Sequence, residues 1–256
     1  MAFDVRVLSV GRTEIPGPEL FWMSEWDRWF PLSFNVVLIR GEGVTALVNT
    51  GAPADLGPLN EIWASILGPR ARYEREPGET VEAGLASLGV RPDDVTHVVV
   101  TPFQLYSTAG IPLFGNAEIC VSRTGWTHFH TTHDHPHDNR WTSFSPEVLV
   151  HLVTDAWDRV RLLADDDEVV PGLRTWWAGT HHRASLAVEV DSTAGTVVAS
   201  DAFFYYENVE DNRVLGINES MYEALACYER TRRVADHIVP LYDPKVFDRY
   251  PGGVIV

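Results

Sequence analysis

The chain has 256 residues, of which 45% are apolar, and a formal net charge of −16 at pH 7. This composition is that of a folded globular protein, and the negative charge disfavours nucleic acid and anionic membranes as partners because both attract cationic surfaces. No apolar run approaches the ~20 residues of a membrane span, and the first thirty residues lack a basic stretch followed by an apolar core, so we expect no membrane partner and a cytoplasmic protein.

Strand and helix patterns alternate along the chain without an obvious linker, which predicts a single domain over residues 1–256. Mixed sheets covered by helices, an α/β class, are the expected product of this alternation. Ser220 and Glu223 have capping-box spacing at the start of the last helix. We expect helices at 56–67, 80–88 and 220–237, and strands at 5–10, 35–40, 46–49, 97–101, 117–122, 159–163, 186–190 and 196–200.

Aromatic residues gather in two places. Trp22 and Trp26 begin a group of roughly helical spacing near the amino terminus, and Phe204 and Tyr205 belong to a run that follows Asp201. Large rings beside a site bind apolar or aromatic substrates, so we predict substrate contacts for these four rings. The alternative is that they form core or homodimer contacts.

Residues 128–138 hold five of the ten histidines. Histidines two residues apart project to the same side of an extended segment, and such a tract can wrap a metal ion. We predict that His130, His133 and His135 contribute to a metal site. The alternative is a polar surface loop that binds only adventitious metal.

The segment His97-Val-Val-Val-Thr-Pro-Phe-Gln-Leu-Tyr-Ser-Thr-Ala-Gly110 resembles the end of a buried strand followed by the metal loop of the metallo-β-lactamase superfamily, which reads His-x-His-x-Asp-His. The four ligand positions hold Pro102, Gln104, Tyr106 and Ser107. Proline has no donor atom there, and neutral hydroxyl and amide groups are poor zinc ligands. The resemblance therefore implies the fold of a binuclear metal hydrolase without its first metal site.

Further segments extend the resemblance over roughly residues 34–251, and it is closest to the N-acyl-homoserine lactonase branch. Residues 34–51 look like the first hairpin of that family, with Asn49 where the family has an aspartate. The run Gly-Thr-His-His-Arg-Ala-Ser-Leu at 179–186 resembles a later family segment and places His181 at the third histidine position. The resemblance implies an αββα sandwich.

The remaining family positions are Asp201, at the bridging aspartate, and Tyr242, at the last histidine; Phe204 stands where the lactonases have a catalytic tyrosine. Of the six ligand positions, only His181 and Asp201 keep a usual metal-binding side chain. The resemblance thus implies either no cofactor or a single divalent ion (zinc, manganese or iron) held by His181, Asp201 and the histidine-rich tract. A standard binuclear centre is not expected.

The implied fold brings Tyr106, Ser107, His181, Asp201 and Tyr242 to one cavity. An aspartate can fix an imidazole tautomer, and that imidazole can remove a proton from a hydroxyl or a substrate carbon. Ser107 as nucleophile and a tyrosine as general acid both stay open. Buried polar groups that merely satisfy one another are the alternative.

Neighbouring residues supply candidate substrate contacts. His182 is a second candidate base, Arg183 can bind a carboxylate or phosphate through two hydrogen bonds, and Gln104, at one of the family's ligand positions, is a further candidate substrate contact. We predict an enzyme that acts on a small cyclic or aromatic carbonyl compound, by lactone, ester or amide hydrolysis or a related lyase or isomerase step. The alternative is a non-catalytic pseudoenzyme that binds a metabolite or a protein partner.

Overall fold

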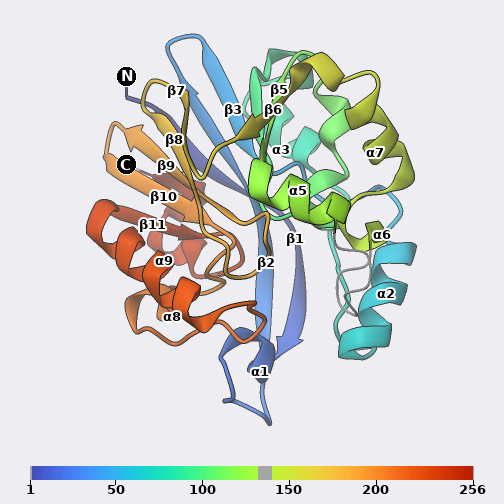
Figure 1. Cartoon of the computed structure of the whole chain (residues 1–256), viewed down its shortest axis with the longest axis vertical. Coiled ribbons are helices and arrows are strands. Elements are labelled where there is room, and N and C mark those ends of the chain that lie inside the picture. Colours follow the sequence, from blue (N-terminus) through green and yellow to red (C-terminus); the bar gives the residue numbers. More distant parts are fainter. Residues whose placement is uncertain (1, 132–139, 256) are drawn as a thin grey trace.

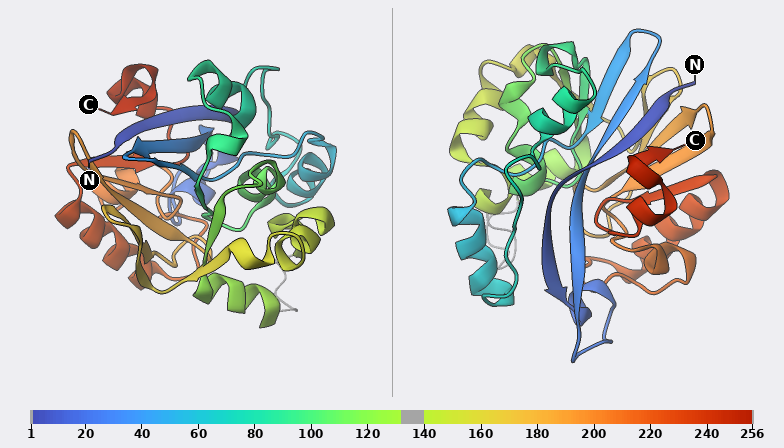
Figure 2. Two further views of the ribbon diagram at one scale, coloured as in Figure 1. Left: turned by 90° about the horizontal axis from the view of Figure 1, so that it is seen from above. Right: turned by 180° about the vertical axis from the view of Figure 1, so that it is seen from behind.

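The computed structural model describes residues 2–131 and 140–255. Within these residues two sheets pack together, with helices on their outer sides (Figure 1). Helices α3 and α5 contact the first sheet, and α8 and α9 contact the second. The views from above and behind show the same layers (Figure 2). The predicted αββα sandwich is confirmed.

The first sheet has seven strands among the described residues, antiparallel from β12 to β3 and parallel from β3 to β6. Residues 36–39 are all buried, so this stretch is apolar on both faces of the sheet. In sheet order the strands are β12 (Val254–Ile255), β1 (Asp4–Pro16), β2 (Trp29–Gly41), β3 (Val44–Val48), β4 (His97–Val99), β5 (Glu118–Ser122) and β6 (Val160–Leu163).

The second sheet has five strands in the described part of the chain and is antiparallel except for the pair β10 and β11. A separate apolar cluster, which includes Trp176, Phe203 and Tyr228, lies between this sheet and α9. In sheet order the strands are β11 (His237–Pro240), β10 (Gly195–Ser200), β9 (Leu186–Ser192), β8 (Leu173–Trp177) and β7 (Asp166–Val170).

The helices are mostly short. The α-helices are α1 (Gly17–Leu20), α2 (Gly57–Leu67), α3 (Val81–Ser87), α4 (Leu105–Thr108), α5 (Arg123–Thr131), α6 (Arg140–Ser143), α7 (Pro146–Val153), α8 (Tyr206–Glu210), α9 (Met221–Val234) and α10 (Val246–Arg249). The 3-10 turns are η1 (Pro92–Asp94), η2 (Ile111–Leu113), η3 (Trp157–Arg159) and η4 (Pro251–Gly253). None of the helices in the described ranges has the length and apolarity to cross a membrane.

Two predicted elements differ from the structure. The strand predicted at 5–10 runs from Asp4 to Pro16, where it pairs with Trp29 of β2. The aromatic group that begins at Trp22, whose spacing is roughly helical, therefore ends in a strand. The predicted helix over 220–237 ends at Val234, because His237 pairs with Val197 and starts β11. In both places pairing with another strand overrides local spacing.

The sheets place four chain segments together. The carboxyl ends of β3, β4 and β10 lie next to the start of β9. Hydrogen bonds among residues 49, 101, 186 and 201 connect these four places. Side chains that are far apart in sequence therefore meet at one end of the paired sheets.

Candidate active site

Asp201 follows β10 directly and is completely buried. One carboxylate oxygen accepts a hydrogen bond from the Thr101 hydroxyl. The other accepts from the Ser185 hydroxyl at 2.5 Å and contacts the Nδ1 atom of His181 at 3.0 Å. Three side chains from separate segments thus surround this buried carboxylate, and the two hydroxyls among them donate to it.

His181 lies in the loop between β8 and β9, and its side chain is 6% exposed. Because the Asp201 carboxylate accepts at Nδ1, that nitrogen carries the proton and Nε2 is the basic nitrogen of the ring. The ring of Phe204 packs edge-on against the imidazole at 4.8 Å between centroids. The sequence prediction that His181 and Asp201 face each other is met in the structure.

The loop that carries His181 is anchored from α9. Glu219 and Glu223 form ion pairs with Arg183, and the backbone N–H of Glu219 donates to the carbonyl of Thr180 at 2.7 Å. Arg183 also donates to the carbonyl of Gly179. Two carboxylates thus already occupy the guanidinium that the sequence assigned to a substrate anion, so that assignment is not supported and Arg183 fixes the loop instead.

Asn49 and Thr101 tie the end of β3 to the loop after β4. The Asn49 amide donates to the Thr101 carbonyl at 2.6 Å and accepts from its N–H at 2.8 Å, with Asn49 itself in the left-handed region at φ 68°. The Thr101 hydroxyl then accepts from the Leu186 N–H at 2.7 Å. Sequence reasoning missed the roles of Thr101 and Ser185; the position of Ser185 at the end of the lactonase-like run 179–186 was the available signal.

Aromatic rings fill the space beside the pair His181 and Asp201. Phe34 packs against Tyr106 at 4.8 Å and against Tyr242 at 5.5 Å, and Tyr242 packs against Phe204 at 4.5 Å. All four rings are buried. The centroid of Tyr242 lies 6.4 Å from that of His181, so the predicted convergence on one place is met for these residues.

Two tyrosine hydroxyls are enclosed in this packing. Burial raises the pKa of Tyr106 and of Tyr242 well above the ordinary value, and the nearby Asp201 charge acts in the same direction. The hydroxyls of Tyr106 and Ser107 influence the pKa of Tyr242, yet the Tyr242 hydroxyl has no well-aligned hydrogen-bond partner among the described residues. It is therefore a neutral hydroxyl that lies beside the Tyr106 and Ser107 hydroxyls without a well-aligned hydrogen bond to either.

The donor set does not fit a binuclear metal centre. Pro102 and Ser107 are buried at two of the family's ligand positions, Gln104 is half-buried at a third, and the Asp201 carboxylate is already surrounded by three protein donors. The divalent cations of such centres need several free carboxylate or imidazole donors. Across residues 2–131 and 140–255, no group of three or more histidine, cysteine or acidic side chains is placed to hold a metal ion.

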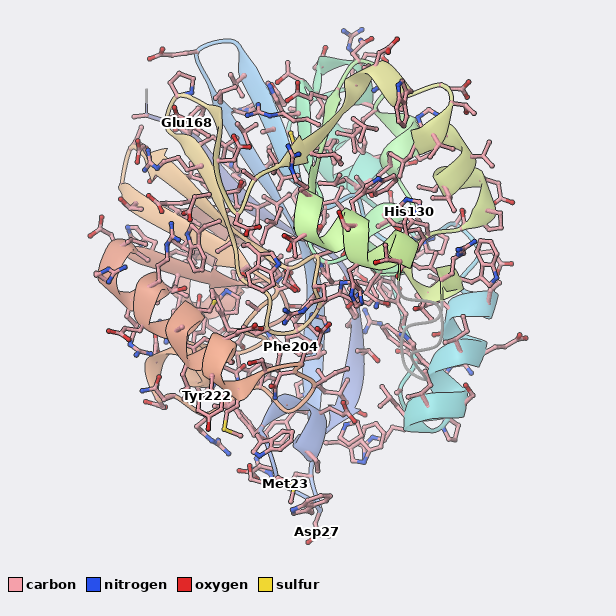
Figure 3. All side chains as sticks on the ribbon, viewed as in Figure 1. Met23, Asp27, His130, Glu168, Phe204 and Tyr222 are labelled. Carbon is pink, nitrogen blue, oxygen red and sulfur yellow. The ribbon has the colours of Figure 1, made fainter. Side chains whose placement is uncertain are left out.

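The histidine-rich tract differs from its predicted form where it is described. His128 and His130 lie on α5, so their side chains point about 200° apart around the helix axis and not to one side. The His130 ring packs edge-on against Trp126 at 4.7 Å, and Figure 3 shows it on α5, to one side of the centrally placed Phe204. His133 and His135 lie outside the described residues.

The other predicted substrate contacts lie in different places, and not all of them are near His181. The His182 ring is buried, and its Nδ1 accepts from the Ala184 N–H at 3.0 Å. The Tyr205 hydroxyl donates to the carbonyl of Pro31 and its ring packs against Phe21, so it is directed away from His181. Trp22 and Trp26 are exposed in the turn between β1 and β2. Of the four aromatic candidates, only Phe204 contacts His181 through a described ring contact.

No protein-family profile matches the chain. The chain is 23% identical over 193 residues to the N-acyl homoserine lactonase AiiB of Agrobacterium fabrum, covering 71% of this chain and 67% of that protein. An N-acyl homoserine lactone hydrolase with N-hexanoyl-L-homoserine at its catalytic metal centre superposes with a TM-score of 0.81 at 18% identity, over 100% of both chains.

Two further solved structures agree. A variant of AiiA from B. thuringiensis with N-decanoyl-L-homoserine at its active site gives a TM-score of 0.80 at 18% identity over 100% of both chains. AidC, a dizinc quorum-quenching lactonase, gives 0.68 at 13% identity over 98% of this chain and 89% of that one. The chain thus has the fold of the N-acyl homoserine lactonases and other metallo-β-lactamase-fold hydrolases.

Proposed function

We propose that this chain, which has the fold of the N-acyl homoserine lactonases, hydrolyses a lactone or ester of a small cyclic or aromatic compound by metal-independent acid–base chemistry. The observation that carries the proposal is the contact between the Nδ1 atom of His181 and the fully buried carboxylate of Asp201 at 3.0 Å. A carboxylate in this place fixes the imidazole tautomer and stabilises the imidazolium that forms when Nε2 accepts a proton.

In the proposed reaction Nε2 of His181 takes a proton from water while the water oxygen bonds to the substrate carbonyl carbon. The carbonyl π electrons move onto oxygen, and they re-form the carbonyl when the bond to the leaving oxygen breaks. The imidazolium returns its proton to that oxygen, so a lactone and water give a hydroxy acid. Thr101 and Ser185 are positioning residues, because their hydroxyls hold Asp201.

The oxyanion of this reaction needs hydrogen-bond donors, and Tyr242 is our candidate. Its buried hydroxyl lies beside the hydroxyls of Tyr106 and Ser107 without a well-aligned hydrogen bond to either, and it stays protonated because burial raises its pKa. Tyr106, at 6.0 Å between ring centroids, is the second candidate. The described hydrogen bonds include none between Ser107 and His181, so we propose water as the nucleophile instead of Ser107.

A binding protein without catalysis is the second candidate function. It is favoured by the close packing of Phe34, Tyr106, Tyr242 and Phe204 in the region that holds metal ligands in the lactonases. Apolar rings that surround a few polar groups also suit the binding of a small carbonyl compound. The single-ion alternative, with His181, Asp201, His130, His133 and His135 as ligands, depends in part on residues outside the described ranges.

The test uses a panel of N-acyl homoserine lactones, simple lactones and aryl esters with the purified, untagged protein. Changing His181→Gln is expected to lower kcat/KM on any substrate that is turned over by roughly 100-fold to 10,000-fold. The matched control is His151→Gln on α7, where the imidazole contacts only Asp155 in the described ion pairs. Wild-type turnover that persists in His181→Gln would contradict the proposal, as would binding without any turnover across the panel.

A further inference from the structure

One end of the molecule carries a concentration of exposed apolar side chains. The ribbon of β1 and β2 reaches beyond the rest of the fold and ends in α1 and the turn 21–28, next to α8 and the start of α9 (Figure 1). Met23, Asp27 and Tyr222 lie at this end in Figure 3. We call the exposed apolar residues here the end patch; they are Trp22, Met23, Trp26, Ile217, Met221, Tyr222 and Leu225.

The two segments of the end patch are fixed to each other. The Trp22 N–H donates to the Val214 carbonyl and the Ile217 N–H to the Glu19 carbonyl, each at 2.8 Å. A Cβ added at Gly216 would lie 1.7 Å from the carbonyl oxygen of Pro18, so the backbones touch. The patch is therefore a defined surface and not a loose loop.

The turn that presents the tryptophans holds unfavourable backbone geometry. Met23 and Glu25 are in the left-handed region, at φ 53° and 57°, which is unfavourable for residues that carry a Cβ atom. Arg213 compensates by pairing with Glu25 and stacking on the Phe21 ring at 3.6 Å. The tertiary structure thus maintains a turn whose largest side chains point to solvent.

The exposed area exceeds what a monomer usually leaves open. Trp22 is 48% exposed, Trp26 65% and Tyr222 87%. With ~150–250 Å² for a whole aromatic side chain and somewhat less for the aliphatic ones, the end patch offers roughly 600–800 Å². The largest apolar patch of a typical monomer is about 300–600 Å², whereas a stable interface buries about 800 Å² on each partner.

We propose that the end patch is the interface of a homodimer in which two copies meet through a two-fold axis. A net charge of −16 opposes contact with an anionic membrane. The rim of the patch carries two exposed neighbours of opposite charge, Asp27 and Arg28. In a dimer with a two-fold axis here, Asp27 of one copy would face Arg28 of the other, and the reverse. An apolar centre with a charged rim is the usual anatomy of such an interface.

The dimer has a consequence for the candidate site. Phe21 lies at the base of the patch and contacts Tyr205 at 6.3 Å, and the next residue, Phe204, contacts His181. In a dimer joined at this end, the candidate site of each copy therefore lies toward the part of that copy that meets its partner. This inference does not depend on the proposed function, because an interface forms with or without catalysis.

Sedimentation velocity from about 1 µM to about 100 µM tests the proposal. The wild type is expected to pass from the 28.7 kDa monomer to twice that mass. The double change Trp26→Ser and Tyr222→Ser should weaken dimerisation at least tenfold, about 1.4 kcal/mol, while far-ultraviolet circular dichroism shows an intact fold. The matched control is Trp157→Ser in η3, which is 63% exposed outside the patch.

Salt provides an independent readout. Two protomers of charge −16 repel each other, so screening by salt should tighten an apolar dimer, whereas salt would weaken one held by ion pairs. A wild type that stays monomeric at the highest concentration would overturn the proposal. So would a dimer that survives the double change but is lost in the Trp157→Ser control, or a double variant that keeps its mass and loses only affinity for apolar substrates.

Discussion

At the residue scale, the pair His181 and Asp201 is distinguished by how completely its carboxylate is enclosed. Each oxygen of Asp201 accepts from at least one side-chain donor, and the group has no exposed surface. A buried charge is stable only when its hydrogen bonds are satisfied. The same enclosure that makes Asp201 a poor metal ligand makes it a rigid support for an imidazole base.

The variant Tyr242→Phe tests whether the buried hydroxyl of Tyr242 has a role in catalysis. Because an unsatisfied buried hydroxyl costs stability, Tyr242→Phe should raise the free energy of unfolding by about 1 kcal/mol. If the hydroxyl stabilises the oxyanion, kcat should fall by roughly tenfold or more in the same variant. Urea unfolding and steady-state kinetics measure the two effects.

The matched control is Tyr228→Phe, since the Tyr228 hydroxyl is equally buried but accepts from the Leu215 N–H at 3.1 Å. Removing that acceptor leaves a buried N–H unpaired, so this variant should be destabilised by about 1 kcal/mol and keep its kcat. A Tyr242→Phe variant that is destabilised to the same extent, with unchanged kcat, would show that its hydroxyl is bonded and not catalytic.

At the element scale, α9 supports the site from outside it. Its first turn supplies Glu223, and the residue before its N-cap, Glu219, joins it in pairing with Arg183 in the loop that carries His181. The sequence predicted a capping box between Ser220 and Glu223. Half of it forms, because the Ser220 hydroxyl accepts from the Glu223 N–H at 3.3 Å while the Glu223 carboxylate pairs with Arg183.

The cap gives an element-scale prediction. Ser220→Ala should lower the free energy of unfolding by about 1 kcal/mol, because an N–H of the first turn loses its acceptor. Ser65→Ala is the control, since Ser65 is exposed near the end of α2 and donates only to the Ile62 carbonyl among the described hydrogen bonds. A change in the control within about 0.5 kcal/mol is expected. Equal losses in the two variants would remove any special role for the cap.

At the scale of the whole molecule, the fold keeps the layers of a metal hydrolase while its centre is filled by rings. The two sheets still bring β3, β4, β9 and β10 together, and Phe34 packs against Tyr106 and Tyr242, which stand at two ligand positions of the resembling family. Buried aromatic area stabilises a core by itself. We therefore expect the fold to hold its centre together without bound ions.

Removal of metal tests whether the fold is stable without bound ions. After dialysis against a strong chelator, the unfolding temperature should change by no more than about 2 °C, since a lost structural ion would shift it much further. Turnover of any substrate found should also persist. One tightly bound zinc, manganese or iron per chain, whose removal abolishes turnover, would instead favour the single-ion alternative.

The amino-acid sequence was enough to predict the layered fold and to name His181 and Asp201 as a pair. Short apolar strands bounded by turn residues, together with ordered family-like segments, predicted the αββα sandwich that the structure has, and His181 and Asp201 were named from those segments. Such features are local: they depend on periodicity and on runs of a few residues, which a single chain displays.

The partners in hydrogen bonds and ion pairs became known from the folded structure alone. Thr101 and Ser185 became supports of Asp201, Arg183 was taken up by two glutamates, and Tyr205 was turned to Pro31. The tryptophan-bearing turn was likewise shaped by the pairing of β1 with β2, the strands on either side of it. A hydrogen bond or ion pair depends on which segments the fold brings within about 3 Å, and residue spacing along one chain does not contain that information.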